Sequence, residues 1–213
     1  MYNSFGKTMA GLNIPVNFAA PLADVSSAND ISDSVNTIRR LQDEISILKT
    51  QLLQLEQKAD ADPLVPIYNR RAFMREIGRA QVLMSRYDIL CSVIFFDLNG
   101  FKLINDKFGH SIGDDLLIKI GEALKSTVRD CDMVARIGGD EFAVLLFKTD
   151  VAEAKAKAAS LACRIAEQRI DMAGETISVS SAWGVSPCYP DDTAKQILHR
   201  ADRAMYEIKA NSR

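Results

Sequence analysis

The sequence predicts an α+β fold, an α/β sandwich in which helices cover a mixed β-sheet, preceded by an N-terminal coiled-coil helix. Two observations predict it. Across residues 69–210, short apolar runs alternate with segments of helical periodicity, and a glycine turn joins two of the runs as a hairpin. Before them, residues 35–58 carry regularly spaced apolar side chains with no Gly or Pro.

The N-terminal third divides into a tail and a stalk. Residues 1–30 are rich in Asn, Ser, Ala and Gly without a period, which favours a flexible tail over a partner-binding segment. Residues 31–61 are predicted to form a coiled-coil stalk that joins two copies of the chain, because so short a helix is marginal alone. An amphipathic helix lying on its own domain is the alternative. The predicted seam consists of Ile38, Leu41, Ile45, Leu48, Leu52 and Leu55.

Residues 62–213 are expected to form one further domain. Pro63 breaks the stalk helix, and Asn69 is a candidate N-cap for a helix that buries Phe73, Ile77, Leu83 and Met84. The run 89–96 predicts a buried strand that ends at Asp97 and is followed by a short helical loop. A longer helix is predicted over about residues 113–129.

The centre of the domain is the hairpin. Met133–Ile137 and Phe142–Phe147 flank Gly138-Gly139-Asp140-Glu141, so a glycine turn joins two apolar strands. After it, the pattern predicts an Ala-rich helix near 151–169, a strand near 175–186 and a final helix from about 192 to 210.

Three carboxylates are predicted to meet at one edge of the sheet. If the strand ending at Asp97 neighbours the hairpin, Asp97 converges with Asp140 and Glu141. Convergent carboxylates without a basic partner repel, and a divalent cation is the usual remedy. Gly138 and Gly139 leave room for a bulky anion to approach the backbone. The alternative for each acid alone is a solvated turn carboxylate.

Composition limits the classes of partner. A net charge of −2, with 25% charged and 47% hydrophobic residues, favours neither a nucleic-acid nor an anionic-membrane partner. The four cysteines show no CxxC spacing, which favours reduced thiols in a cytoplasmic protein. No apolar stretch approaches 18 residues, so no membrane span is predicted, and the N-terminus is a poor signal peptide.

Five motifs in order along residues 62–213 resemble the GGDEF family of diguanylate cyclases. They are Asp62-Pro-Leu with Tyr68–Phe73, Asp97–Lys102 with Ile104–Asp106, Gly109-His110 with Gly113-Asp114, the signature Gly138–Phe142, and Ala201–Lys209. The resemblance implies the core of polymerase palm domains and class III nucleotidyl cyclases. It also implies that a homodimer condenses two GTP into cyclic di-GMP and two pyrophosphates.

The resemblance assigns roles to single residues. Two Mg²⁺ (or Mn²⁺) per active site would be held by Asp97, Asp140 and the Leu98 carbonyl, with Asp140 and Glu141 as catalytic acids. Guanine would be read by Asn105 and Asp114, whose oxygens suit its N–H donors. The remaining GTP contacts would be Gly100, Phe101, Lys102, Gly138, Gly139, Lys209 and Arg213.

A product-inhibition site is implied as well. Arg129 and Asp132 form an Arg-x-x-Asp set five residues before the signature, where the family binds cyclic di-GMP, and Arg136 would add a contact. The alternative is an exposed ion pair at a helix end. Two segments depart from the family pattern, Leu64–Ile67 and Asn211–Arg213. A non-catalytic module that binds GTP or cyclic di-GMP is the alternative function, and the intact acids count against it.

Overall fold

The computed structural model describes residues 28–172 and 174–211. The chain divides into two compact units, residues 1–53 and 54–213. The predicted tail therefore lies almost entirely outside the described residues, and helix α1 (Ala28–Asp60) begins three residues before the predicted stalk. Across the described ranges, every helix is too short or too polar to cross a membrane.

Helix α1 is continuous over 33 residues, in agreement with the absence of Gly and Pro. Its apolar seam faces solvent, because the six seam residues from Ile38 to Leu55 are between 47 and 64% exposed. A helix that leaves a row of Leu and Ile side chains in water gains little from the hydrophobic effect. That this seam packs against the same helix of a second copy therefore stays a prediction.

The second unit is built on one five-stranded sheet in the order β1-β3-β4-β2-β7. Strand β1 runs parallel to β3, and the other pairs are antiparallel. The strands are β1 (Tyr68–Asn69), β2 (Cys91–Leu98), β3 (Met133–Arg136), β4 (Glu141–Phe147) and β7 (Ser181–Pro187). The helices are α2 (Arg70–Tyr87), α3 (Phe101–Phe108), α4 (His110–Thr127), α5 (Val151–Ala166) and α6 (Ala194–Asn211).

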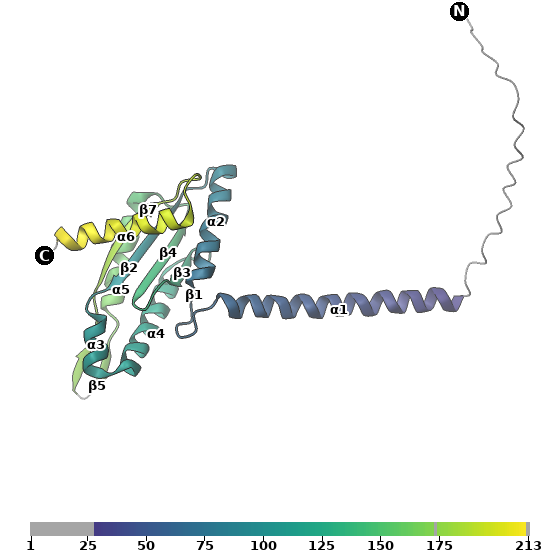
Figure 1. Cartoon of the computed structure of the whole chain (residues 1–213), viewed down its shortest axis with the longest axis horizontal. Coiled ribbons are helices and arrows are strands. Elements are labelled where there is room, and N and C mark those ends of the chain that lie inside the picture. The colour runs from purple at the N-terminus through teal and green to yellow at the C-terminus, as the bar shows by residue number, and fades with distance from the viewer. Residues whose placement is uncertain (1–27, 173, 212–213) are drawn as a thin grey trace, which may run out of the picture. The chain divides into compact units, whose positions relative to one another are not determined.

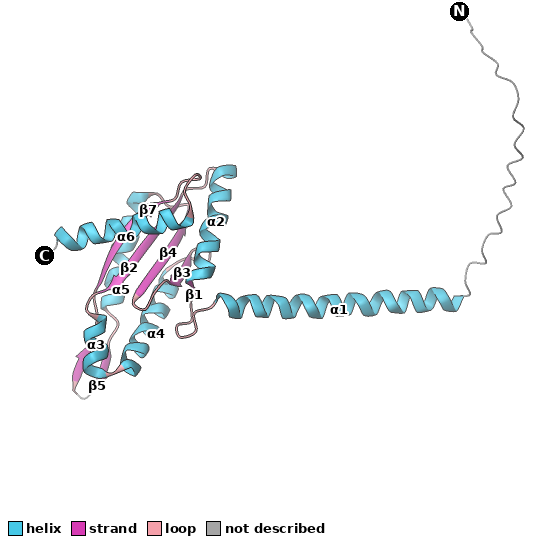
Figure 2. Cartoon of the chain, in the orientation of Figure 1, coloured by secondary structure: helices cyan, strands magenta, loops and turns pink. Residues whose placement is uncertain are grey.

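Helices cover both faces of this sheet, which confirms the predicted α/β sandwich (Figure 1, Figure 2). Helices α4 and α5 pack on one face in a core that includes Phe96 and Phe142. Helices α2 and α6 pack on the other face in a core that includes Phe95 and Leu145. Because side chains alternate along a strand, Asp97 shares the α2–α6 face with Phe95.

A local signal sets the start of α2. Asn69 caps α2 as predicted, since its Oδ1 accepts a hydrogen bond from the Ala72 amide at 3.0 Å.

Helix α6 lies directly on β7, because a Cβ on Gly184 would overlap the Ala201 carbonyl and the Met205 amide. This backbone contact fixes the height of α6 above the sheet.

The prediction of a single strand near residues 175–186 is wrong. Residues Glu175–Ile177 form β6, which pairs with β5 (Ile170–Met172) in a separate two-stranded sheet, and β7 begins only at Ser181. Between them the Ser180 carbonyl accepts a hydrogen bond from the Asn99 amide at 2.8 Å. The chain leaves the small sheet because this segment packs against the loop after β2.

Candidate active site

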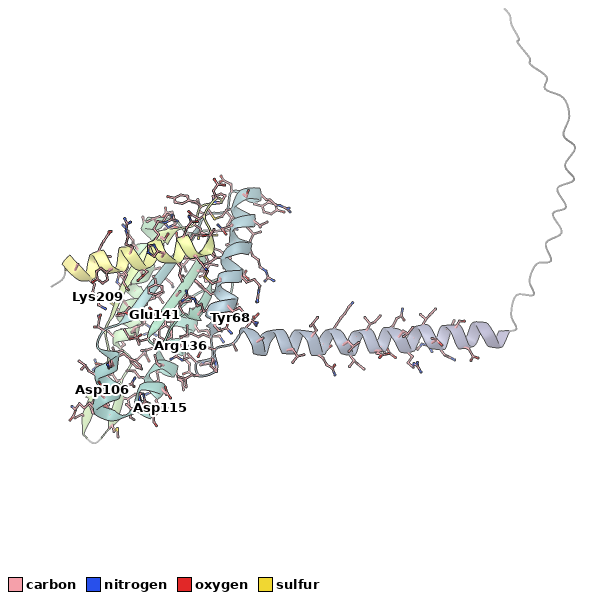
Figure 3. All side chains as sticks on the ribbon, viewed as in Figure 1. Tyr68, Asp106, Asp115, Arg136, Glu141 and Lys209 are labelled. Atoms are coloured by element: carbon pink, nitrogen blue, oxygen red, sulfur yellow. The ribbon has the colours of Figure 1, made fainter. Side chains whose placement is uncertain are left out.

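The structure brings the three predicted acids to the same end of β2 and β4. These strands are antiparallel neighbours, and Asp97 lies directly opposite Glu141. The Leu98 amide donates to the Asp140 carbonyl at 3.1 Å, which holds the glycine turn against the end of β2. The predicted pairing of the two strands is confirmed. In Figure 3, Glu141 lies on the sheet between Arg136 and Lys209 in that view.

The acids perturb one another. Burial raises the pKa of Glu141, and the neighbouring charges of Asp140, Asp97 and Asp202 raise it further, against the opposing effect of Arg70. Gly138 has a role in this packing, because a Cβ there would overlap the Glu141 carboxylate. The first glycine of the signature thus makes room for a protein side chain, whereas the space beside Gly139 is open.

Asp97 has a basic partner that the sequence did not reveal. The Lys209 Nζ donates to Asp97 Oδ1 at 2.6 Å, across a sequence separation of 112 residues. Lys209 stands in the last turn of α6, and both side chains are partly buried. The expectation that the acids lack a basic partner is therefore wrong for Asp97.

The oxygen donors at this end of the sheet fit a divalent cation whose remaining ligands come from the substrate. Among the described residues, no three His, Cys, Asp or Glu side chains form a metal cage. Mg²⁺ is commonly held by one or two carboxylates together with substrate phosphates, and Asp97, Asp140 and the Leu98 carbonyl are a donor set of that kind. The Lys209 ammonium is the positive charge that contacts the Asp97 carboxylate in the structure.

The predicted phosphate contacts form the start of α3. Gly100 has φ 72° and ψ 17°, a left-handed conformation that suits glycine, and α3 begins at Phe101. The first amides of a helix lack partners within it and point towards its N-terminus, where an anion is stabilised. Lys102 is exposed in the first turn. The loop from Asp97 to Lys102 therefore puts phosphate donors close to an acid.

The predicted guanine-reading residues meet where α3 packs on α4. The Oδ1 atom of Asn105 is buried and has no hydrogen-bond partner within the described residues. Gly113 lies against it so closely that a Cβ there would overlap the amide oxygen. Asp114, the next residue, is exposed. A buried acceptor without a donor, next to an exposed carboxylate, suits a ligand that presents several N–H groups.

The predicted product site is ordered by backbone contacts. Asp132 Oδ2 accepts from the Arg129 amide and Oδ1 accepts from the Phe147 amide, both at 3.1 Å. Arg129 is exposed. The link within this motif is thus between the Asp132 carboxylate and the Arg129 backbone, and two backbone amides hold the carboxylate in place.

Arg136 contacts the signature turn. Its Nη2 and Nε donate to the Gly139 carbonyl at 2.7 and 3.1 Å, and its Nη1 lies 3.3 Å from Asp62 Oδ1. Asp62 also accepts from the Leu64 and Val65 amides. Sequence reasoning missed this link, although an Asp before Pro is a turn signal that marks Asp62. Of the predicted GTP contacts, Arg213 lies outside the described residues.

A pocket opens beside Glu141 on the α2–α6 face. Arg70, Lys195, His199 and Asp202 line it together with Glu141 and Phe95. None of these four residues from α2 and α6 was given a role from the sequence, although Arg70 and Asp202 lie within two of the motifs. Their helical spacing on α6 places Lys195, His199 and Asp202 on one face, which is the signal that could have found them.

Comparisons with known proteins agree with this geometry. Residues 59–213 match the family model described as "Diguanylate cyclase, GGDEF domain". The chain is 36% identical over 180 residues to the bifunctional diguanylate cyclase/cyclic di-GMP phosphodiesterase MucR of Pseudomonas aeruginosa, covering 82% of this chain and 26% of MucR. It is 33% identical over 204 residues to the diguanylate cyclase TpbB of the same species, covering 91% of this chain and 45% of TpbB.

The solved structures agree as well. The crystal structure of a sensory box/GGDEF family protein from Caulobacter crescentus superposes with a TM-score of 0.65 at 33% identity, covering 71% of this chain and 99% of that one. By contrast, the chain spans only about a quarter to a half of the two curated relatives.

Proposed function

Because the chain belongs to the GGDEF diguanylate cyclase family, we propose that it condenses two GTP into cyclic di-GMP and two pyrophosphates. One observation carries this proposal. Asp97, Asp140 and Glu141 converge at the end of β2 and β4, and α3 begins at Phe101, close after Asp97 in the chain. Phosphoryl transfer needs this combination, since the protein has mainly to position the reactants and neutralise charge.

The acids would serve the metal and the attacking hydroxyl. Asp97, Asp140 and the Leu98 carbonyl would hold two Mg²⁺ or Mn²⁺, which lower the pKa of a 3′-hydroxyl and stabilise the charge of the triphosphate when bound. Glu141 lies opposite Asp97 and has a raised pKa, so its carboxyl group is suited to hold or accept a proton from that hydroxyl.

The phosphates and the base would be bound on either side of these acids. Gly100, Phe101 and Lys102 supply backbone donors and an ammonium for the triphosphate, and Lys209 adds a second ammonium. Arg213 stays a proposal without a structural account. Asn105 and Asp114 would accept from the N1–H and N2–H₂ donors of guanine. Adenine lacks these donors and would leave the Asn105 oxygen unpaired.

We further propose that the active form is a homodimer. The described residues contain one set of metal donors and one base-reading pair, so one subunit would present one GTP, and the product needs two. The exposed seam of α1 supplies a surface of coiled-coil type for this association. The proposed compartment is the cytoplasm, because the four cysteines are all unpaired thiols.

Cyclic di-GMP would inhibit from a second site at Arg129 and Asp132. The Asp132 carboxylate is held by two backbone amides, and the Arg129 side chain is free to reach a guanine edge or a phosphate. Arg136 was predicted to assist there. Its guanidinium is engaged with Gly139 and Asp62, so we assign it first to positioning the signature turn.

The test is incubation of the protein with GTP and Mg²⁺, with the products separated by chromatography. We expect cyclic di-GMP and pyrophosphate in a one-to-two ratio, and no cyclic product from ATP. GTP that binds but stays intact would overturn the cyclase proposal in favour of a non-catalytic binding module.

A further inference from the structure

The ion pair between Lys209 and Asp97 joins two residues to which the proposed function gives different ligands. Asp97 would hold the metal, and Lys209 would hold the triphosphate. In the structure, the two side chains pair with each other, with Nζ 2.6 Å from Oδ1. The ammonium therefore takes up the carboxylate oxygen at which a cation would bind.

The two cations compete for that oxygen. Mg²⁺ binds carboxylate oxygens at about 2.0–2.1 Å, and an ammonium in contact with the same oxygen would lie a few ångströms from it, where like charges repel. An incoming metal must displace Lys209, and a triphosphate nearby offers the displaced ammonium a new anionic partner.

We propose that Lys209 is an exchangeable counter-ion: it neutralises Asp97 while the site holds no metal and moves to the phosphates when metal and nucleotide arrive together. This rests on the proposed function. Metal and nucleotide would then favour each other's binding beyond their direct contact, because each removes one partner of the existing pair.

The exchange needs only a side-chain movement. Helix α6 is fixed to β7 by the close backbone contact at Gly184, and its Ala201 and Met205 are buried. Lys209 lies one turn beyond Met205, and its side chain is 33% exposed. Its flexible four-carbon stem can therefore swing without shifting the helix.

The test measures metal binding without nucleotide, so that its outcome does not depend on turnover. Binding of Mn²⁺ alone to the full chain is followed by electron paramagnetic resonance of the free ion, for wild type and Lys209→Met. The variant keeps the apolar stem and loses the charge. We expect it to bind Mn²⁺ about two- to fivefold more tightly, the size typical of a partly exposed ion pair.

The same variant should change nucleotide binding in the opposite direction. We expect Lys209→Met to weaken binding of a non-hydrolysable GTP analogue, in the presence of Mn²⁺, by about tenfold, because a charge-assisted phosphate contact is lost. Lys102→Met is the matched control, since it removes an ammonium that is not paired with Asp97. It should weaken the analogue and leave the affinity for Mn²⁺ alone unchanged.

Asp97→Asn completes a double-mutant cycle. In that background, Lys209→Met should bring no gain in Mn²⁺ affinity, because the negative charge for which the two cations compete is gone. Unchanged or weaker Mn²⁺ binding by Lys209→Met alone would overturn the exchange, whatever the cyclase assay gives. Tighter Mn²⁺ binding without any cyclic di-GMP formation would support the exchange and overturn the proposed reaction.

Discussion

Helix α1 and the five-stranded sheet with its covering helices (the sheet unit) use the same apolar residue types with opposite results. In the sheet unit, Phe96, Phe142 and Leu145 are completely buried, whereas the Leu and Ile residues of the α1 seam keep about half of their surface in water. The sheet unit thus buries its apolar side chains within itself, whereas α1 leaves those of its seam exposed. We therefore propose that the sheet unit carries the catalytic residues for one GTP (a half-site), and that α1 brings the half-sites of two subunits together. Mutations should then separate them.

Asp140→Asn should remove the chemistry and leave assembly intact. Losing a charged metal donor should lower the rate of cyclic di-GMP formation by about a thousandfold, because the charge of the transition state is no longer neutralised. Sedimentation and thermal unfolding should match wild type. Glu122→Gln, an exposed acid on α4, is the control and should keep full activity. Turnover within a few-fold of wild type for Asp140→Asn would remove Asp140 from the site.

Gly184→Ala should break the sheet unit without touching α1. The new methyl group would meet backbone atoms of α6, which cannot move as a side chain would, so we expect a loss of about 3 kcal/mol and a fall in Tm of about 6–12 °C. Gly78→Ala on α2 is the control, because nothing lies within 4 Å of its Cβ position. It should be neutral or slightly stabilising. Equal melting of both variants would mean that α6 is not fixed to β7 at this point.

Ile45→Asp combined with Leu48→Asp should break assembly and spare the sheet unit. Charges buried in a coiled-coil seam should weaken association by about a hundredfold, and activity should fall most at low protein concentration and recover on concentration. The control places the same charges outside the seam, as Ser46→Asp with Thr50→Asp. Sedimentation and specific activity on dilution check the result. If neither differs from wild type, α1 does not bring the half-sites together.

Arg129→Ala should leave both chemistry and assembly in place and change only their regulation. The concentration of added cyclic di-GMP needed for half inhibition should rise about tenfold, while the GTP dependence of the initial rate stays nearly unchanged. Salt should weaken the inhibition of wild type, because the ligand is anionic. Arg79→Ala, an exposed arginine on α2 that pairs with Glu76, should behave as wild type. Equal inhibition of all three proteins would place feedback elsewhere.

The fold could be predicted where a local pattern had no rival. Helix α2 followed from its Asn69 cap and its apolar periodicity, α5 followed from its Ala-rich sequence, and the hairpin followed from Gly138-Gly139 between two apolar strands. The segment near residues 175–186 was predicted to be one continuous strand. That segment divides because Ser180 bonds to the loop after β2, a tertiary contact with no signal in the local sequence.

In the candidate site, too, some features could be predicted from the sequence and others could not. The acids at 97, 140 and 141 could be found because each stands at the end of a recognisable strand. The contacts of Lys209 with Asp97 and of Arg136 with Asp62 join residues 112 and 74 positions apart, and they depend on side-chain direction in the folded chain. Sequence reasoning gave both basic residues a ligand role and missed the protein partners that hold them.

The unpaired oxygen of Asn105 has a consequence for the stability of the unliganded protein. A buried acceptor without a donor costs about 1–3 kcal/mol, so the fold is less stable than it would be with an apolar side chain at that position. A base that donates to this oxygen recovers the loss, and a base without a donor does not. We propose that base selectivity rests on this unpaired oxygen: a variant such as Asn105→Leu should melt at a higher temperature and should no longer discriminate guanine from adenine.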